Sequence, residues 1–144
     1  MPNRTVKEPY IRIAKRNLAM ARLLHLRGYH EGSVFHAYHA FECVISAGIA
    51  SQNRRIPYSH INKVHDFKTY CRKIIAGTQL QAEFASLSTL LVSLASGKRI
   101  NQVRNQALYW MNKQEPQNRF GKRDAILFTW RVRHFLREAQ GVFP

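Results

Sequence analysis

Apolar residues recur at every third or fourth position along almost the whole chain, and no segment alternates apolar and polar residues as a half-buried strand does. This periodicity predicts an all-α fold, an up-and-down bundle of five helices. The predicted helices lie near residues 10–27, 31–50, 59–76, 78–96 and 124–140. With 144 residues and no internal repeat, the chain is expected to form a single domain, residues 1–144, with its core at about 10–140.

Two predicted segments stand out from the regular pattern. Residues 31–50 are apolar around most of the helix circumference, so this helix is either central to the bundle or covered by a second subunit. Residues 98–123 form the least regular stretch, and connections of this length inside a compact domain often carry function. The first helix is expected to start after Pro9 and to stop at Gly28.

The net charge narrows the class of partner. The chain carries 23 Lys and Arg against 8 Asp and Glu, a formal charge of +15. A charge this high causes self-repulsion in the folded state, so we expect it to serve a purpose such as binding a polyanionic partner. Nucleic acid is the commonest one, with an anionic membrane, an acidic protein or a merely basic surface as alternatives. The basic residues are spread out without a run of five, so a polybasic membrane tether is not expected.

The sequence shows no membrane span, secretion signal or cysteine motif. No stretch approaches the ~18–20 uninterrupted apolar residues of a membrane span, and the first nine residues lack the apolar core of a secretion signal. We therefore expect a cytoplasmic protein without a membrane partner. Cys43 and Cys71 have no CxxC spacing, so buried, reduced thiols are favoured over a zinc site or a disulfide.

Two histidines share one face of a predicted helix. His36 and His39 are three positions apart, and Glu42 lies one further turn along. These side chains have metal-ligand chemistry, but further carboxylate ligands are scarce in this chain. A packed or interfacial histidine pair is the favoured interpretation, and we expect neither a metal nor a cofactor.

The irregular stretch contains the segment Arg104-Asn105-Gln106-Ala107-Leu108-Tyr109. Arg104 offers a planar cationic fork suited to a phosphate, and Asn105 adds a neutral donor and acceptor beside it. On a helix, Arg104 and Tyr109 would be roughly 140° apart, so two such motifs would meet most readily across a two-fold axis. A structural alternative has Arg104 capping a helix or pairing with Glu42, with Tyr109 in the core.

Two stretches of the chain resemble the HEPN family, small helical domains named for higher eukaryotes and prokaryotes nucleotide binding. Residues 23–42 resemble the family's first hairpin, with an apolar helix, the turn Gly28-Tyr29, and a helix rich in Ala and aromatic residues that carries Glu42. Pro57-Tyr58-Ser59-His60 is similar to the Pro-x-Thr/Ser-His start of the next helix. The resemblance covers roughly residues 10–140.

The resemblance implies metal-independent RNA cleavage by a motif of Arg, a polar residue, three or more variable positions and His. Arg104 and Asn105 match its first two positions, and Tyr109 stands where the shortest spacing would place His. Tyrosine, with a pKa near 10, is a poor general base at neutral pH. The motif is therefore degenerate, or its chemistry is altered. His36, His39 or His60 are substitutes by residue type, although nothing in the sequence directs them toward Arg104.

The resemblance further implies a homodimer and a cognate minimal nucleotidyltransferase, often as a toxin with its antitoxin. The leading hypothesis is a HEPN-type RNA-binding protein, an endoribonuclease of a toxin–antitoxin or defence system, with Arg104, Asn105 and Tyr109 as catalytic residues. The electropositive path to RNA would comprise Arg99, Arg104, Arg119, Lys122 and Arg123. The alternative is a non-catalytic dimeric module that binds a nucleotidyltransferase or another acidic partner. A helix-turn-helix DNA-binding regulator is weaker, since no recognition-type helix pair stands out.

Overall fold

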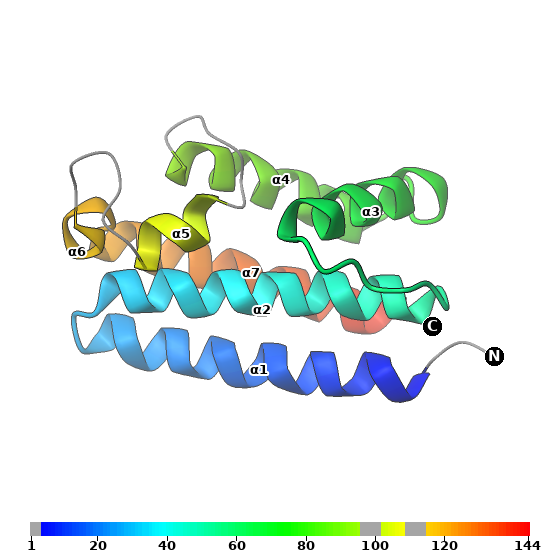
Figure 1. The fold of residues 1–144 in the computed structure, drawn as a ribbon, viewed down its shortest axis with the longest axis horizontal. Helices are drawn as coiled ribbons and strands as arrows, with labels where there is room; N and C mark the ends of the chain where they lie inside the picture. Colours follow the sequence, from blue (N-terminus) through cyan, green and yellow to red (C-terminus); the bar gives the residue numbers. More distant parts are fainter. Residues whose placement is uncertain (1–3, 96–101, 109–114) are drawn as a thin grey trace.

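Every regular element in the described part of the chain, residues 4–95, 102–108 and 115–144 of this computed structural model, is a helix (Figure 1). The helices are α1 (Arg4–Leu26), α2 (His30–Ser51), α3 (His60–Lys73), α4 (Gln79–Leu94), α5 (Gln102–Leu108), α6 (Pro116–Arg119) and α7 (Lys122–Val142). None of these described helices has the length and apolar character that crossing a membrane requires.

The all-α bundle is confirmed, but the predicted count of five helices is wrong. The described residues hold six helices of seven residues or more, together with the single turn α6. The additional elements, α5 and α6, lie in the stretch predicted as an irregular connection. The periodicity of the sequence did not predict them, because elements of seven and four residues are too short to show a repeating apolar stripe.

Helices α1 and α2 form an antiparallel hairpin closed at Gly28. Gly28 has a φ of 85°, a conformation that glycine adopts without strain, and the Tyr29 N–H bonds to the Leu24 carbonyl at 2.9 Å in the pattern of a Schellman cap. The expected end of the first helix is thus confirmed. Its expected start is wrong, because α1 begins at Arg4 and Pro9 lies inside it. Pro9 is the sixth residue of α1, and because it has no N–H to donate, the helix continues through it with one backbone hydrogen bond fewer.

Helix α2 is the central helix of the bundle. It is buried continuously from Ala40 to Ser51 and packs against α1, α3, α5, α6 and α7 of the same chain. A Cβ atom at Gly48 would lie 2.7 Å from both Phe67 and Phe143, so this glycine lets the two rings approach the helix. Of the two alternatives for its broad apolar surface, the central position is confirmed.

The core is built around four phenylalanines, one each from α2, α3, α4 and α7. Their ring centroids lie 5.0–6.3 Å apart, within the usual range of aromatic pairs, and the residues are Phe41, Phe67, Phe84 and Phe135. Cys43 and Cys71 are buried free thiols beside this core, as expected. Burial raises the pKa of Cys43 to about 11 and that of Cys71 to about 12.

The chain turns back after α2 before α3 begins. The extended segment between them runs along α2, so the first turn of α3 lies beside the middle of α2 (Figure 1). Ser59 ends this segment as the N-cap of α3, its Oγ accepting from the Asn62 N–H at 3.1 Å, and Thr78 caps α4 in the same way. This return places His60, the first residue of α3, beside Glu42.

Candidate functional site

A cleft of about 360 Å³ lies between α1, α2, α3 and α5. Its volume falls in the range of small-ligand sites, roughly 300–1,000 Å³. We call it the histidine cleft, and its lining residues are Tyr10, Asn17, Phe35, His36, His39, Glu42, Cys43, Ser46, His60, Lys63 and Arg104. Three histidines and one arginine, from three different helices, thus meet around one space.

The wall formed by α2 carries two of these histidines. His36 and His39 lie on the cleft face of α2, which confirms that they share a face. The Asn17 Nδ2 donates to the Ile13 carbonyl at 2.9 Å, so its Oδ1 faces His36 Nδ1 at 2.8 Å. Because an amide oxygen only accepts, His36 carries its proton on Nδ1 in this arrangement. The other ring nitrogen, Nε2, is left to accept a proton or a hydrogen bond.

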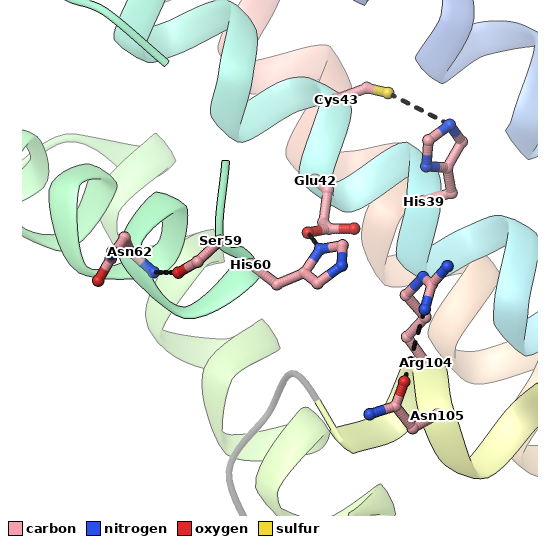
Figure 2. Close-up of polar contacts among 8 residues, drawn as sticks. All are labelled: His39, Glu42, Cys43, Ser59, His60, Asn62, Arg104 and Asn105. Carbon is pink, nitrogen blue, oxygen red and sulfur yellow. Dashed lines mark hydrogen bonds and ion pairs between the residues drawn. The ribbon is translucent and has the colours of Figure 1, made fainter. Parts of the chain in front are cut away.

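A buried carboxylate holds the third histidine. Glu42 is only 3% exposed, and its Oε2 pairs with Nδ1 of His60, whose side chain is 41% exposed (Figure 2). A carboxylate accepts the Nδ1 proton and orients the ring, as it does for catalytic histidines in general. The other ring nitrogen of His60, Nε2, takes no part in this contact.

Helix α5 brings Arg104 to the cleft. Val103, Gln106 and Ala107 form its buried face, and the Gln106 Nε2 donates to the Ala95 carbonyl at 3.4 Å. Arg104 and Asn105 lie on the remaining face of the helix. Figure 2 shows Arg104 directed into the same space as His39 and His60.

Two contacts hold the Arg104 guanidinium. Its Nη1 donates to the Asn105 Oδ1 at 3.5 Å, and its Cζ lies 5.7 Å from the ring centroid of Phe35, a cation–π distance. The Asn105 Nδ2 in turn donates to the Gln102 Oε1 at 3.5 Å. Asn105 therefore acts on Arg104 as a positioning residue. The alternative in which Arg104 pairs with Glu42 is not observed, because Glu42 pairs with His60 instead.

Burial lowers the pKa of both cleft histidines of α2, His36 and His39. Burial is the main cause that lowers the pKa of His39; Glu42 opposes this effect, and Lys63 and Arg104 reinforce it. Burial also lowers the pKa of His36, with a smaller contribution from His39. Imidazoles with lowered pKa values in one cleft with Lys63 and Arg104 can accept a proton from an anion that these cations hold.

A comparison with family models decides the family. The model of the HEPN domain matches residues 8–138. The chain belongs to the HEPN domain family. This confirms the resemblance drawn from the first hairpin and the Arg104 segment. Comparisons with curated proteins and with solved structures returned no match. Membership indicates a ribonuclease or nucleotide-related function in general terms.

The remaining predicted site residues of this HEPN domain fall into two groups. Tyr109 and Arg99 lie outside the described residues. Arg119 is half-buried at the end of α6, while Lys122 and Arg123 are exposed at the start of α7, and all three lie outside the lining of the histidine cleft. The cations expected to form one path are thus distributed over two regions.

Several cleft residues of the HEPN domain were not predicted. Asn17, Phe35 and Lys63 had no distinguishing motif, and their roles arise from contacts between helices. The pairing of His60 with Glu42 was equally hidden, because it depends on the chain returning along α2. Within the described ranges, no three His, Cys, Asp or Glu side chains are grouped as a metal site would require.

Proposed function

We propose that this HEPN protein binds RNA and cleaves it in the histidine cleft as a metal-independent endoribonuclease. The single observation that carries the proposal is that Arg104 shares one cleft with three histidines, each of which has a hydrogen-bonding partner: Asn17 for His36, Cys43 for His39 and Glu42 for His60. The motif of this chain has Tyr109 where the family has a histidine, and in the proposal the cleft histidines supply the missing proton-transfer group. The +15 charge favours a polyanionic substrate of this kind.

Arg104 and Lys63 are the phosphate-binding groups of the proposal. The guanidinium of Arg104 presents two parallel N–H donors to phosphate oxygens, and Phe35 and Asn105 restrict its orientation. Lys63 adds a point charge from α3. Stabilising the charge that develops on the phosphate is commonly the largest contribution to such a reaction.

The proposed cleavage uses two histidines of the cleft in different roles. His39, whose pKa is lowered by burial, takes the proton of the ribose 2′-hydroxyl as the hydroxyl oxygen attacks the adjacent phosphorus. The 2′-oxygen–phosphorus bond forms, and the bond from phosphorus to the 5′-oxygen breaks. His60, whose Nδ1 is paired with Glu42, is the proposed general acid and gives a proton from Nε2 to the departing 5′-oxygen. The products are a 2′,3′-cyclic phosphate and a 5′-hydroxyl.

The proposal also includes partners. We assign the protein to a homodimer with a cognate minimal nucleotidyltransferase, in a toxin–antitoxin or defence system. Family membership supports this assignment, and an acidic partner would neutralise the high positive charge. Light scattering of the purified protein tests the dimer; co-purification with a nucleotidyltransferase encoded beside it tests the partner.

The test of cleavage compares the wild-type protein with Arg104→Ala on a labelled RNA in the presence of EDTA. We expect a cyclic-phosphate product from the wild type and a loss of at least about 100-fold in the single-turnover rate for the variant. Arg72→Ala, which removes an exposed arginine of α3, is the matched control and should cleave normally. Equal rates for wild type and Arg104→Ala would overturn the assignment.

The degenerate motif favours a second function, a non-catalytic module that binds a nucleotidyltransferase or another acidic partner. The substitution of Tyr109 for the motif histidine is the observation behind it. This function predicts a stable complex that survives Arg104→Ala, with no RNA cleavage by either form. Cyclic-phosphate formation by the wild type would exclude it.

A further inference from the structure

The outward side of α7 carries a tryptophan that the fold does not bury. Trp130 is 48% exposed, whereas tryptophan is highly buried on average. Ile126 and Leu127, one turn earlier, are also exposed, while the opposite side of α7 packs on α1, α2 and α4. Helix α7 is described along its whole length and contributes no residue to the histidine cleft; it passes behind α2 in Figure 1.

Neighbouring side chains hold the indole of Trp130. The His134 ring centroid lies 4.3 Å from that of Trp130 at an interplanar angle of 60°, and the Arg131 Cζ lies 5.2 Å from the indole centroid. An edge-on aromatic contact and a cation–π contact restrict the rotamers of the indole. Trp130 is thus a pre-ordered aromatic platform with a large part of its surface open to solvent.

The charges around this platform all have one sign on the exposed side. Every exposed charged residue of α7 is a cation, whereas Asp124 and Glu138 are half-buried, and Asp124 Oδ2 is engaged by the Gly121 N–H at 3.0 Å. We call this surface the α7 face, formed by Lys122, Arg123, Ile126, Leu127, Trp130, Arg133 and Arg137. The adjoining groove between α1 and α7 adds Lys15 and Arg22 beside Arg133.

Charge decides between the occupants that an exposed aromatic surface can have. A second copy of the chain, docked by a two-fold axis, would set these cations against their own counterparts. A membrane surface requires a continuous outward apolar face, but four of the seven residues of the α7 face are cationic. A polyanion with flat apolar groups satisfies both features of the surface.

We infer that the α7 face is a second nucleic-acid site that binds single-stranded RNA, with a base stacked on Trp130 and phosphates along the arginines. Only an unpaired strand presents base faces for stacking, so a duplex is excluded from this mode. Arg123 and Arg137 are separated by roughly 21 Å along the helix at 1.5 Å per residue, enough for several nucleotides. The inference deepens the proposed RNA binding but uses none of the cleft residues.

Trp130 itself reports the test. In a Trp110→Phe background, a 12-nucleotide single-stranded RNA should quench Trp130 fluorescence, and a duplex of the same length should leave it largely unchanged. In the otherwise native chain, fluorescence anisotropy should show Trp130→Ala and Trp130→Leu binding the single strand about fivefold or more weakly. Trp130→Phe should stay within about twofold, because it keeps an aromatic ring.

The leucine variant separates stacking from apolar contact. If Trp130→Leu binds RNA as the wild type does, or if anionic vesicles or polyglutamate quench Trp130 as strongly as RNA does, the inference is wrong. Unchanged binding in Trp130→Ala with lost binding in Arg104→Ala would place all RNA contact in the cleft and also overturn it. Quenching without any RNA cleavage would support the inference while rejecting the proposed ribonuclease.

Discussion

The histidine cleft and the α7 face are both basic, but they hold their cations in different ways. In the cleft, Arg104 is fixed by Phe35 and Asn105, and His60 is fixed by the buried carboxylate of Glu42. On the α7 face the arginines are exposed, and only the aromatic platform is ordered by neighbours. Chemistry requires groups held in place, whereas affinity for a flexible polyanion requires charge and stacking surface. This difference supports the two proposals, cleavage in the histidine cleft and retention of RNA on the α7 face.

The largest effect should come from removing the proposed base. His39→Ala should slow RNA cleavage by about 100- to 10,000-fold, the usual contribution of general acid–base catalysis, and should leave RNA affinity within about twofold. Single-turnover cleavage and anisotropy measure the two quantities. His65→Ala, an exposed histidine of α3, is the control. Parallel losses of rate and affinity would mean that His39 binds RNA rather than transferring a proton.

Stability should distinguish the two regions next. His60→Ala leaves the carboxylate of Glu42 buried without its partner, which should lower the free energy of unfolding by about 1–3 kcal/mol. Trp130→Ala removes an exposed side chain and should change it by about 0.5 kcal/mol or less. Urea denaturation followed by circular dichroism measures both. A larger loss for Trp130→Ala would show that the α7 face is structural.

Salt dependence should then separate the regions by the number of phosphates they contact. The double variant Arg123→Gln/Arg137→Gln should reduce the slope of log affinity against log salt by about 1.4, and Arg104→Gln by about 0.7, for a single strand. Arg72→Gln/Lys73→Gln removes two exposed cations of α3 and should leave the slope unchanged. If all three variants had the same slope of log affinity against log salt, the cations of the α7 face would contribute no more to RNA binding than any other surface charge.

The smallest effect is a pH dependence to which the two cleft histidines contribute, beside His25 of α1, whose pKa is also lowered by burial. Because the folded pKa values of His36 and His39 are lowered from 6.5, the unfolded chain binds more protons below that pH. The contribution of these two histidines to the free energy of unfolding should therefore be complete above pH 6.5 and be lost as the pH drops below it. Urea midpoints at pH 7.5 and 5.5 measure the fall, and His39→Gln should reduce it. If the urea midpoints of the wild type and His39→Gln differed by the same amount at both pH values, the prediction would be contradicted.

Much of the fold was accessible because helical periodicity and caps are local. The stop at Gly28, the caps Ser59 and Thr78, and the central position of α2 as one of two options all follow from residues close in sequence. Helix α5 was missed since its seven residues complete only two turns. The start of α1 was misplaced because a single proline near a helix end is tolerated.

The candidate site divides along the same line. Arg104 was singled out by its residue type and its motif, and His36 and His39 by their spacing on one helix face. Their convergence with His60 could not be predicted from the sequence, because His60 and Arg104 lie 18 and 62 positions from Glu42 along the chain. No local signal encodes such a meeting.

By itself, the sequence determined the helical class, the HEPN family, the strong positive charge and the choice of Arg104 as the cation to examine first. These properties depend on composition and on residues a few positions apart. Only the tertiary structure decided which histidines accompany Arg104 and that Trp130 faces solvent among cations. Packing of distant helices sets these relations, since burial of apolar surface fixes which face of each helix is left for function.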